Sequence, residues 1–266
     1  MLIINIWILF IKGVYVLGFI RLVIVTIYII VMAIVGFIYC LINHPRDPKH
    51  VYTFCRWFNQ IQKIIGVEVE QRGLDNVQNI TNAVYISNHQ SVYDFVTSPG
   101  MLRPRTVSIG KKSLLWIPFF GQLYWITGNI LIDRENKTKA RNTIKQVVEA
   151  IHQRNLSVWV YPEGTRSKGR GLLPFKSGAF RMAMEANVPI IPMCVSSTHN
   201  QFDLNRKDNG RVISEMMEPI DMALYQTMSA RELADYCHGL MEQKIAQLDD
   251  ELKQETIARE SVNSLN

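Results

Sequence analysis

The residues of this chain with the clearest chemical use are a histidine and an aspartate, His89 and Asp94. They follow an apolar run, residues 83–86, which predicts a buried strand. One turn of chain lets the carboxylate accept a hydrogen bond from one ring nitrogen, which fixes the tautomer. The other ring nitrogen is then a base for a hydroxyl proton, since an unperturbed imidazole titrates near pH ~6.5. Such pairs also occur as ordinary polar contacts, so a catalytic dyad is a hypothesis that further motifs must support.

A glycine-rich basic stretch, residues 161–171, predicts an anion site. It follows an apolar run, residues 156–161, and reads Tyr-Pro-Glu-Gly-Thr-Arg-Ser-Lys-Gly-Arg-Gly. Glycines let backbone N–H groups approach an anion, and arginine can bind two phosphate oxygens at once. The residue order is not that of a P-loop. A solvated basic loop is the alternative interpretation, but such a loop needs no carboxylate directly at a strand end, where Glu163 stands.

Charge and cysteine usage narrow the classes of partner. The 266 residues carry a formal net charge of +6, which suits an anionic partner such as nucleic acid, a phosphate-bearing ligand or a membrane surface. Nucleic acid is disfavoured, because the chain has a single basic cluster and a long apolar N-terminus. The four cysteines are far apart in the sequence, so we expect neither a disulfide framework nor a metal site.

The N-terminus predicts membrane attachment. Residues 22–43 contain no formal charge, and as a helix they would span about 33 Å, close to the thickness of a hydrocarbon core. Residues 2–20 are also apolar but are interrupted by Lys12 and Gly13. Positive residues flank the second run on both sides, so spanning and lying in one leaflet both stay open. We expect membrane-anchoring helices in residues 1–44 and a catalytic α/β domain with a C-terminal helix in residues 45–266.

The rest of the chain alternates between predicted strands and helices. Strands are predicted at residues 66–70, 83–86, 106–109, 128–134, 156–161, 188–195 and 211–216, and helices at 51–65, 137–153, 177–187 and 229–254. This alternation predicts an α/β fold with a largely parallel central sheet flanked by helices. Ligands of such sheets sit beyond the carboxyl ends of the strands, where His89, Lys111, Arg134 and Glu163 are expected to gather.

An aromatic stretch, residues 113–126, is broken by Pro118 and Gly121. So much aromatic surface around a break is typical of a segment that contacts lipid or lines a cavity for an acyl chain. Ordinary core packing explains it equally well.

Taken together, these stretches resemble the membrane glycerolipid acyltransferases, and among them the bacterial 1-acyl-sn-glycerol-3-phosphate acyltransferases. The motif N-H-x-x-x-x-D matches residues 88–94, and a lysine-proline block resembles residues 111–121. A strand that ends in arginine matches residues 128–134, P-E-G-T-R-S matches residues 162–167, and V-P-I-I-P matches residues 188–192. The order and spacing agree, and the resemblance covers most of residues 40–250.

The resemblance implies transfer of a fatty acyl group to the sn-2 hydroxyl of lysophosphatidic acid, which gives phosphatidic acid. The expected donor is acyl-CoA or acyl-acyl-carrier-protein, with no cofactor and no metal. The expected location is the cytoplasmic side of a bacterial inner membrane. The implied catalytic residues are His89 and Asp94, with Ser91 and Cys194 as bystanders. The implied substrate-binding residues are Lys111, Arg134, Glu163, Gly164, Thr165 and Arg166.

Three alternatives stay open at the level of sequence. The acceptor could be another lysophospholipid, glycerol 3-phosphate or an acylated amino-acid lipid. The chain could instead be a catalytically silent membrane protein that binds anionic lipid, in which case His89 would be dispensable. A phosphate-ester hydrolase ranks last, because the sequence offers no evident metal cluster or nucleophile.

Overall fold

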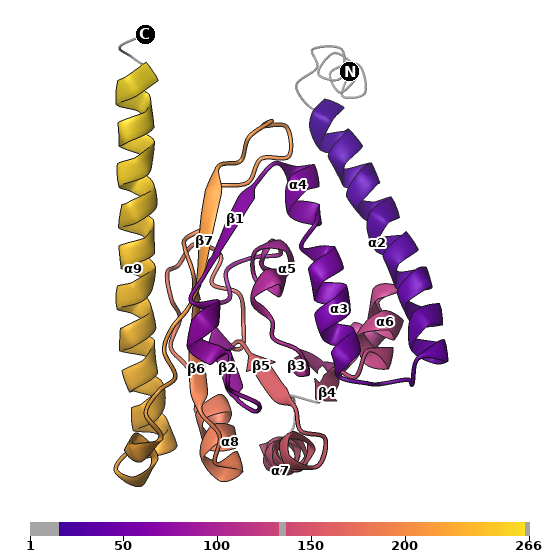
Figure 1. Cartoon of the computed structure of the whole chain (residues 1–266), viewed down its shortest axis with the longest axis vertical. Helices are drawn as coiled ribbons and strands as arrows, with labels where there is room; N and C mark the ends of the chain where they lie inside the picture. Colours follow the sequence, from indigo (N-terminus) through magenta and orange to yellow (C-terminus); the bar gives the residue numbers. More distant parts are fainter. Residues whose placement is uncertain (1–15, 133–136, 264–266) are drawn as a thin grey trace.

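The computed structural model describes residues 16–132 and 137–263 (Figure 1). Within these ranges the chain forms one seven-stranded sheet with the order β1-β7-β6-β2-β5-β3-β4. Its strands are β1 (Glu68–Arg72), β2 (Val84–Ser87), β3 (Thr106–Lys111), β4 (Ile130–Ile132), β5 (Ser157–Val160), β6 (Ile190–Val195) and β7 (Arg211–Met216).

The sheet is parallel except at one junction. Strands β2 to β6 run in one direction, and β7 pairs with β6 in the opposite direction, carrying β1 with it as a parallel neighbour. The predicted α/β class with a largely parallel sheet is therefore confirmed. The carboxyl ends of β2, β3, β4, β5 and β6 share one edge, where parallel strands place their ligands.

The helices cover both faces of the sheet. Their bounds are α3 (Lys49–Phe58), α4 (Ile61–Ile65), α5 (Asp94–Thr97), α6 (Phe120–Ile126), α7 (Lys137–Gln153), α8 (Gly178–Ala186) and α9 (Ala230–Asn263). Helices α8 and α9 contact β2 and β6, whereas α3 and α4 contact β3 and β1. The predicted helix 51–65 is in fact two helices, α3 and α4. The final helix extends nine residues beyond the predicted end at 254, from a capping box in which Ser229 and Glu232 exchange hydrogen bonds.

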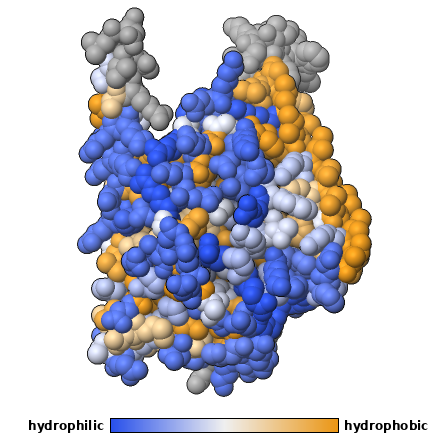
Figure 2. All heavy atoms as spheres, in the orientation of Figure 1, coloured by the Kyte–Doolittle hydropathy of each residue, from blue (hydrophilic) through white to orange (hydrophobic). Residues whose placement is uncertain are grey.

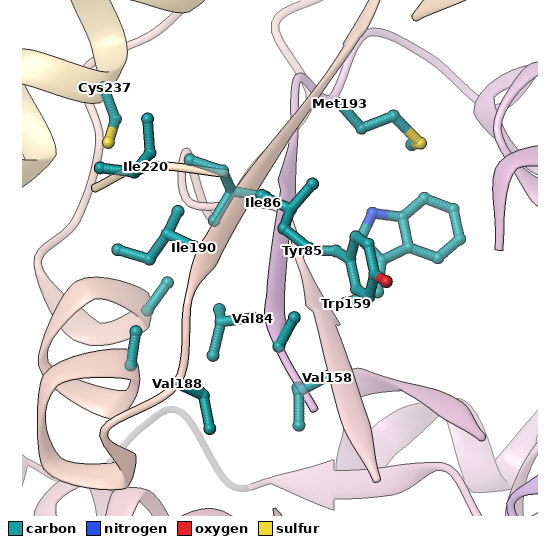
Figure 3. Packing of buried hydrophobic residues seen from close by; sticks show 14 of the residues in the cluster. Val84, Tyr85, Ile86, Val158, Trp159, Val188, Ile190, Met193, Ile220 and Cys237 are labelled. Atoms are coloured by element: carbon teal, nitrogen blue, oxygen red, sulfur yellow. The ribbon is translucent and has the colours of Figure 1, made fainter. Parts of the chain in front are cut away.

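The core lies between the central strands and the helices α7 to α9. Strands β2 and β6 are buried at every position, as expected of strands covered on both faces. Figure 3 shows Val84 and Ile86 of β2 beside Ile190 of β6 and Val158 of β5. This rigid centre holds the ends of β2, β5 and β6 in fixed positions, on which the loops at that edge depend.

Helix α2 (Val16–Ile42) is the part of the described chain long and apolar enough to cross a membrane. It begins six residues before the predicted run 22–43. Residues 1–15 lie outside the described ranges, and with them most of the first predicted apolar run. The predicted boundary at residues 44/45 between a membrane segment and a catalytic domain stays a prediction.

One face of α2 is docked on the α/β domain. Met32, Ala33 and Cys40 are buried against Phe54 of α3 and Leu123 of α6. Near the start of the helix, the buried Arg21 guanidinium donates hydrogen bonds to the carbonyl oxygens of residues 204, 206 and 207 in the loop between β6 and β7. The opposite face of α2 exposes its apolar side chains, and Figure 2 shows them as a continuous hydrophobic band along that side of the molecule.

Candidate active site

The centre of the site is the pair His89 and Asp94, at the carboxyl end of β2. The Nδ1–H of His89 donates a hydrogen bond to Asp94 Oδ2 at 2.5 Å. The Asp94 side chain is only 6% exposed, whereas that of His89 is 20% exposed. A buried carboxylate on Nδ1 leaves Nε2 as the ring nitrogen available to a substrate proton.

Asp94 also orders the loop that carries His89. It is the first residue of α5, and its oxygens accept the backbone N–H of Gln90 at 2.7 Å and of Ser91 at 3.2 Å. These hydrogen bonds give both oxygens of Asp94 donors, which a buried carboxylate requires. The same side chain therefore both orients the imidazole and closes the turn between residues 89 and 94.

Two amides, whose roles the sequence did not reveal, fasten this loop to the end of β6. The buried Asn88 side chain donates to the Val195 carbonyl at 2.8 Å and accepts the Val195 N–H at 2.9 Å. Gln90 donates to the Val195 and Ser196 carbonyls and accepts the Thr198 N–H. Amides suit this position because each can donate and accept at once. The only local sequence feature that could have indicated this attachment is a polar run directly after a buried strand.

The carboxylate of Glu163 connects the histidine loop to the basic loop. Its oxygens accept the backbone N–H of His89 at 2.5 Å and of Leu173 at 3.0 Å. The resemblance implied that Glu163 is a substrate-binding residue, whereas the hydrogen bonds of its carboxylate in the structure are with these two backbone amides. Burial raises the pKa of Glu163 above its ordinary value, and the two N–H donors oppose that shift.

The two loops also join directly through their backbones. The N–H of Ser167 donates to the His89 carbonyl at 2.8 Å, and the N–H of Lys168 donates to the Gln90 carbonyl at 3.0 Å. Arg166 therefore precedes a residue whose backbone is bonded to that of His89, and the Arg166 side chain is exposed. Proximity of Arg166 to His89 follows from this backbone pairing.

The remaining predicted binding residues lie along the same edge. Lys111 ends β3, which is two strands from β2, or roughly 10 Å at ordinary strand spacing. Gly164 has a φ of +70°, and a side chain there would collide with the ammonium group of Lys176, a further cation that the sequence analysis missed. Thr165 is exposed. Arg134 lies outside the described residues.

An aromatic ring supports the imidazole from one side. Tyr161, at the end of β5, stacks on His89 with ring centroids 4.1 Å apart and planes inclined by 19°. Burial, followed by the nearby Asp94 charge, raises the pKa of the Tyr161 phenol well above its ordinary value, so the phenol stays neutral at working pH. The ring is thus placed to hold the imidazole plane rather than to exchange protons.

The two residues predicted to be bystanders, Ser91 and Cys194, have contacts that belong to the fold. Cys194 is fully buried in β6, and burial raises the pKa of its thiol, so it is neither accessible nor ionised as a nucleophile would be. The Ser91 hydroxyl accepts the backbone N–H of Tyr93 within the turn. Within the described ranges, no group of three His, Cys, Asp or Glu side chains gathers as a metal site requires.

The aromatic stretch after β3 is divided between core and surface. Leu123 and Ile126 of α6 are buried, whereas Trp116 is 80% exposed and Phe119 is 48% exposed. Core packing is therefore confirmed for α6, whereas contact of the exposed part with lipid or an acyl chain stays a prediction. The exposed part follows Lys111 directly, so an apolar surface borders the catalytic edge of the sheet.

Sequence comparison relates the chain to known proteins. A family model described as Acyltransferase matches residues 68–196, from the start of β1 to just beyond β6. The 1-acyl-sn-glycerol-3-phosphate acyltransferase of Escherichia coli is 54% identical over 238 residues, which are 90% of this chain and 97% of that protein. The Haemophilus influenzae protein of the same name is 52% identical, over 89% and 98% of the two chains. The chain belongs to the 1-acyl-sn-glycerol-3-phosphate acyltransferase family.

Structural comparison supports the same fold for the family. The crystal structure of the 1-acyl-sn-glycerophosphate acyltransferase PlsC from Thermotoga maritima superposes with a TM-score of 0.70 and covers 88% of this chain and 95% of that one. The two sequences are 22% identical. The architecture is therefore shared between proteins of widely diverged sequence.

We predict that Tyr161 raises the turnover number by stabilising the imidazolium that forms as His89 takes a proton. An aromatic face contributes about 0.5–2 kcal/mol to a nearby cation. Tyr161→Leu should therefore lower kcat about tenfold, with a smaller change in the KM of either substrate. Tyr161→Phe keeps the ring and should retain most of the activity; equal losses in both variants would contradict a role for the stacking.

We predict that protonation of Glu163 contributes to the loss of activity in acid. Because its pKa is raised, the proton binds at a higher pH than it would to an exposed glutamate, and one backbone N–H then loses its acceptor. The acid limb of the kcat profile should reflect two protons in the wild type and one in Glu163→Gln. The Gln variant should also turn over about tenfold more slowly, as expected for one lost hydrogen bond. An unchanged acid limb would exclude Glu163 from this role.

Proposed function

We propose that this chain transfers a fatty acyl group from a thioester to the sn-2 hydroxyl of 1-acyl-sn-glycerol 3-phosphate and so forms phosphatidic acid. The observation that carries the proposal is the hydrogen bond from His89 Nδ1 to the buried Asp94, beside a cationic loop at the carboxyl edge of the sheet. A base, an anion-binding loop and an apolar surface are the parts that this reaction needs. Relatives that match along nearly their whole length carry the name of this activity.

The chemistry proceeds without a covalent acyl-enzyme. His89 Nε2 takes the proton of the sn-2 hydroxyl as its oxygen attacks the thioester carbonyl carbon. Asp94 stabilises the imidazolium that results. The tetrahedral oxyanion collapses, the carbon–sulfur bond breaks, and the thiolate leaves and recovers the proton. The proposed donor is acyl-CoA or acyl-acyl-carrier-protein, both of which present the same thioester, and no cofactor takes part.

The acceptor phosphate occupies the basic loop. It sits on the carbon next to the reacting one, so its site must be adjacent to His89. We assign Arg134 and Arg166 to the phosphate, with Lys111 as a further cation. The backbone of Gly164 and Thr165 shapes the loop, and Glu163 acts on substrate binding through the backbone of His89.

The chain attaches to a membrane through α2 and the exposed aromatic residues after β3. The α/β domain holds α2 at both ends, through Arg21 at its start and through Arg46, which follows its end and donates its backbone N–H to the Ile126 carbonyl at 2.8 Å. A helix covered by protein along one face cannot be surrounded by lipid, which supports an orientation along the membrane boundary. We propose a bacterial inner membrane, with the catalytic domain on the cytoplasmic side.

The decisive experiment is acyl transfer from labelled acyl-CoA to 1-acyl-sn-glycerol 3-phosphate in detergent, for the wild type and His89→Ala. We expect product from the wild type and a loss of at least about 100-fold in the variant, since general base catalysis contributes about 10²–10⁴-fold. A folded variant that keeps its activity would remove the dyad from the mechanism. A panel of acceptors, including glycerol 3-phosphate and other lysophospholipids, tests the choice of substrate.

The phosphate assignment predicts a selective effect of Arg166→Ala. Removal of a charge-assisted hydrogen bond costs about 1.5–3 kcal/mol, so the KM for the acceptor should rise about tenfold or more. The KM for the donor should change little. Arg56→Ala, an exposed arginine on α3, is the matched control. Equal increases in both KM values would reject the assignment of Arg166 to the acceptor.

A further inference from the structure

A second cationic site lies at the opposite edge of the sheet from His89. Three arginines, Arg46, Arg105 and Arg154, line an open hollow of about 410 Å³ between the end of α2, the start of β3 and the end of α7. Arg105 directly precedes β3 and Arg154 precedes β5, so the hollow is at the amino edge of these strands. The acyl transfer described above uses none of these residues.

Positive charge in this hollow exceeds negative charge. Asp47 supplies the one carboxylate among the described residues that line it, and its oxygen accepts the backbone N–H of Lys49 at 2.9 Å. Among the described residues, no ion pair joins any of the three arginines to a carboxylate. Burial, together with the charges of Arg46 and Arg105, lowers the pKa of Arg154. The Asp47 charge opposes that shift, but one carboxylate does not neutralise three guanidinium groups. An added anion would relieve the repulsion that remains between them.

Each arginine also has a structural contact, which explains why it stays in place. Arg105 donates to the Asn155 carbonyl at 2.7 Å, and Arg154 donates to the Arg46 carbonyl at 2.6 Å. The Arg46 guanidinium lies 5.1 Å from the ring centroid of Trp125. These contacts do not account for all of the five N–H donors that a guanidinium carries, so each arginine has capacity for an anion.

The backbone of the hollow is held in an unfavourable conformation. His44, Arg46 and Arg105 have φ values of +60°, +67° and +62°, in the left-handed region that residues other than glycine rarely adopt. Such backbone costs free energy and persists where the surroundings enforce it, often at ligand sites. Asn155, which also lines the hollow, has a φ of +47°, and four such residues around one hollow are an observation independent of the charge.

The surroundings of the hollow indicate a lipid rather than a soluble anion. The last residues of α2, Leu41 and Ile42, are 54% and 76% exposed and lie just before His44. Trp125, beneath Arg46, is 41% exposed. Tryptophan and arginine next to an exposed apolar helix are typical of the level at which membrane headgroups lie. The hollow therefore lies at the end of α2, the helix whose exposed apolar face forms the hydrophobic band of Figure 2.

We propose that Arg46, Arg105 and Arg154 form a binding site for the phosphate of an anionic phospholipid headgroup, separate from the acyl-transfer site. The proposal depends on the membrane attachment proposed above. Binding there would fix the end of α2 at headgroup level and select membrane that contains anionic lipid. The proposed ligand is the phosphate ester of a phospholipid that belongs to the bilayer.

The test is binding of the full-length protein to vesicles of phosphatidylcholine, alone or mixed with phosphatidylglycerol. Phosphatidylglycerol should tighten the binding of the wild type, and Arg46→Gln should remove about fivefold of that gain, since one cation near an anionic surface contributes about that factor. Lys63→Gln, which removes an exposed cation from α4, should keep most of the gain. Equal losses in the two variants would show diffuse charge attraction and overturn the site.

Further arms separate the remaining outcomes. Arg46→Gln should retain acyl transfer in detergent, which verifies its fold, and Arg154→Gln should reproduce its effect on vesicle binding. Inorganic phosphate should leave the melting temperature of the wild type unchanged; a rise that Arg46→Gln abolishes would assign the site to soluble phosphate instead. Wild type that binds phosphatidylcholine without any preference for phosphatidylglycerol refutes this site alone. Wild type that binds neither vesicle refutes the membrane attachment itself.

Discussion

The satisfaction of two buried carboxylates governs the catalytic edge of this protein. Asp94 and Glu163 are each only a few per cent exposed, and a carboxylate in such a place must have its oxygens hydrogen-bonded. The available donors are the imidazole of His89 and backbone N–H groups at residues 89, 90, 91 and 173. The loops fold so that these donors converge, and the position of the His89 ring is a consequence of that convergence.

This requirement joins parts of the chain that have different tasks. Glu163 belongs to the basic loop, yet it holds the backbone of His89, so His89 and the basic loop cannot move independently. Asn88 and Gln90 add a second attachment, to the end of β6. His89, the proposed base, is thus held by the ends of β2, β5 and β6, which are deeply buried strands, and this suits a reaction that needs fixed geometry.

Helix α2 has two different environments on its two faces. Its inner face is packed on α3 and α6, and its outer face is apolar and exposed. The Arg21 side chain points into the α/β domain, where three backbone carbonyl oxygens accept hydrogen bonds from its guanidinium group. At the far end, the hollow of arginines stands beside the same apolar band. Domain packing and the exposed apolar surface are consequently on opposite faces of one helix.

The sequence by itself determined the chemistry and the class of fold. Periodicity is local, so most strands and helices were predicted within a few residues, and the motif spacing brought out His89, Asp94 and Arg166. The expectations that needed revision were also local: the break between α3 and α4, and the division of the aromatic segment between core and surface.

Only the tertiary structure decided which distant residues meet. The reversed direction of β1 and β7, the contact of Glu163 with residue 89, the attachment of Asn88 to Val195 and the stacking of Tyr161 on His89 all join residues from separate elements. Arg21 finds its partners 183 to 186 residues along the chain. Such contacts leave no periodic trace in the sequence, because they depend on how loops from different strands pack at one edge. The sequence therefore carries the reacting groups, and the packing of the sheet and its loops sets their geometry.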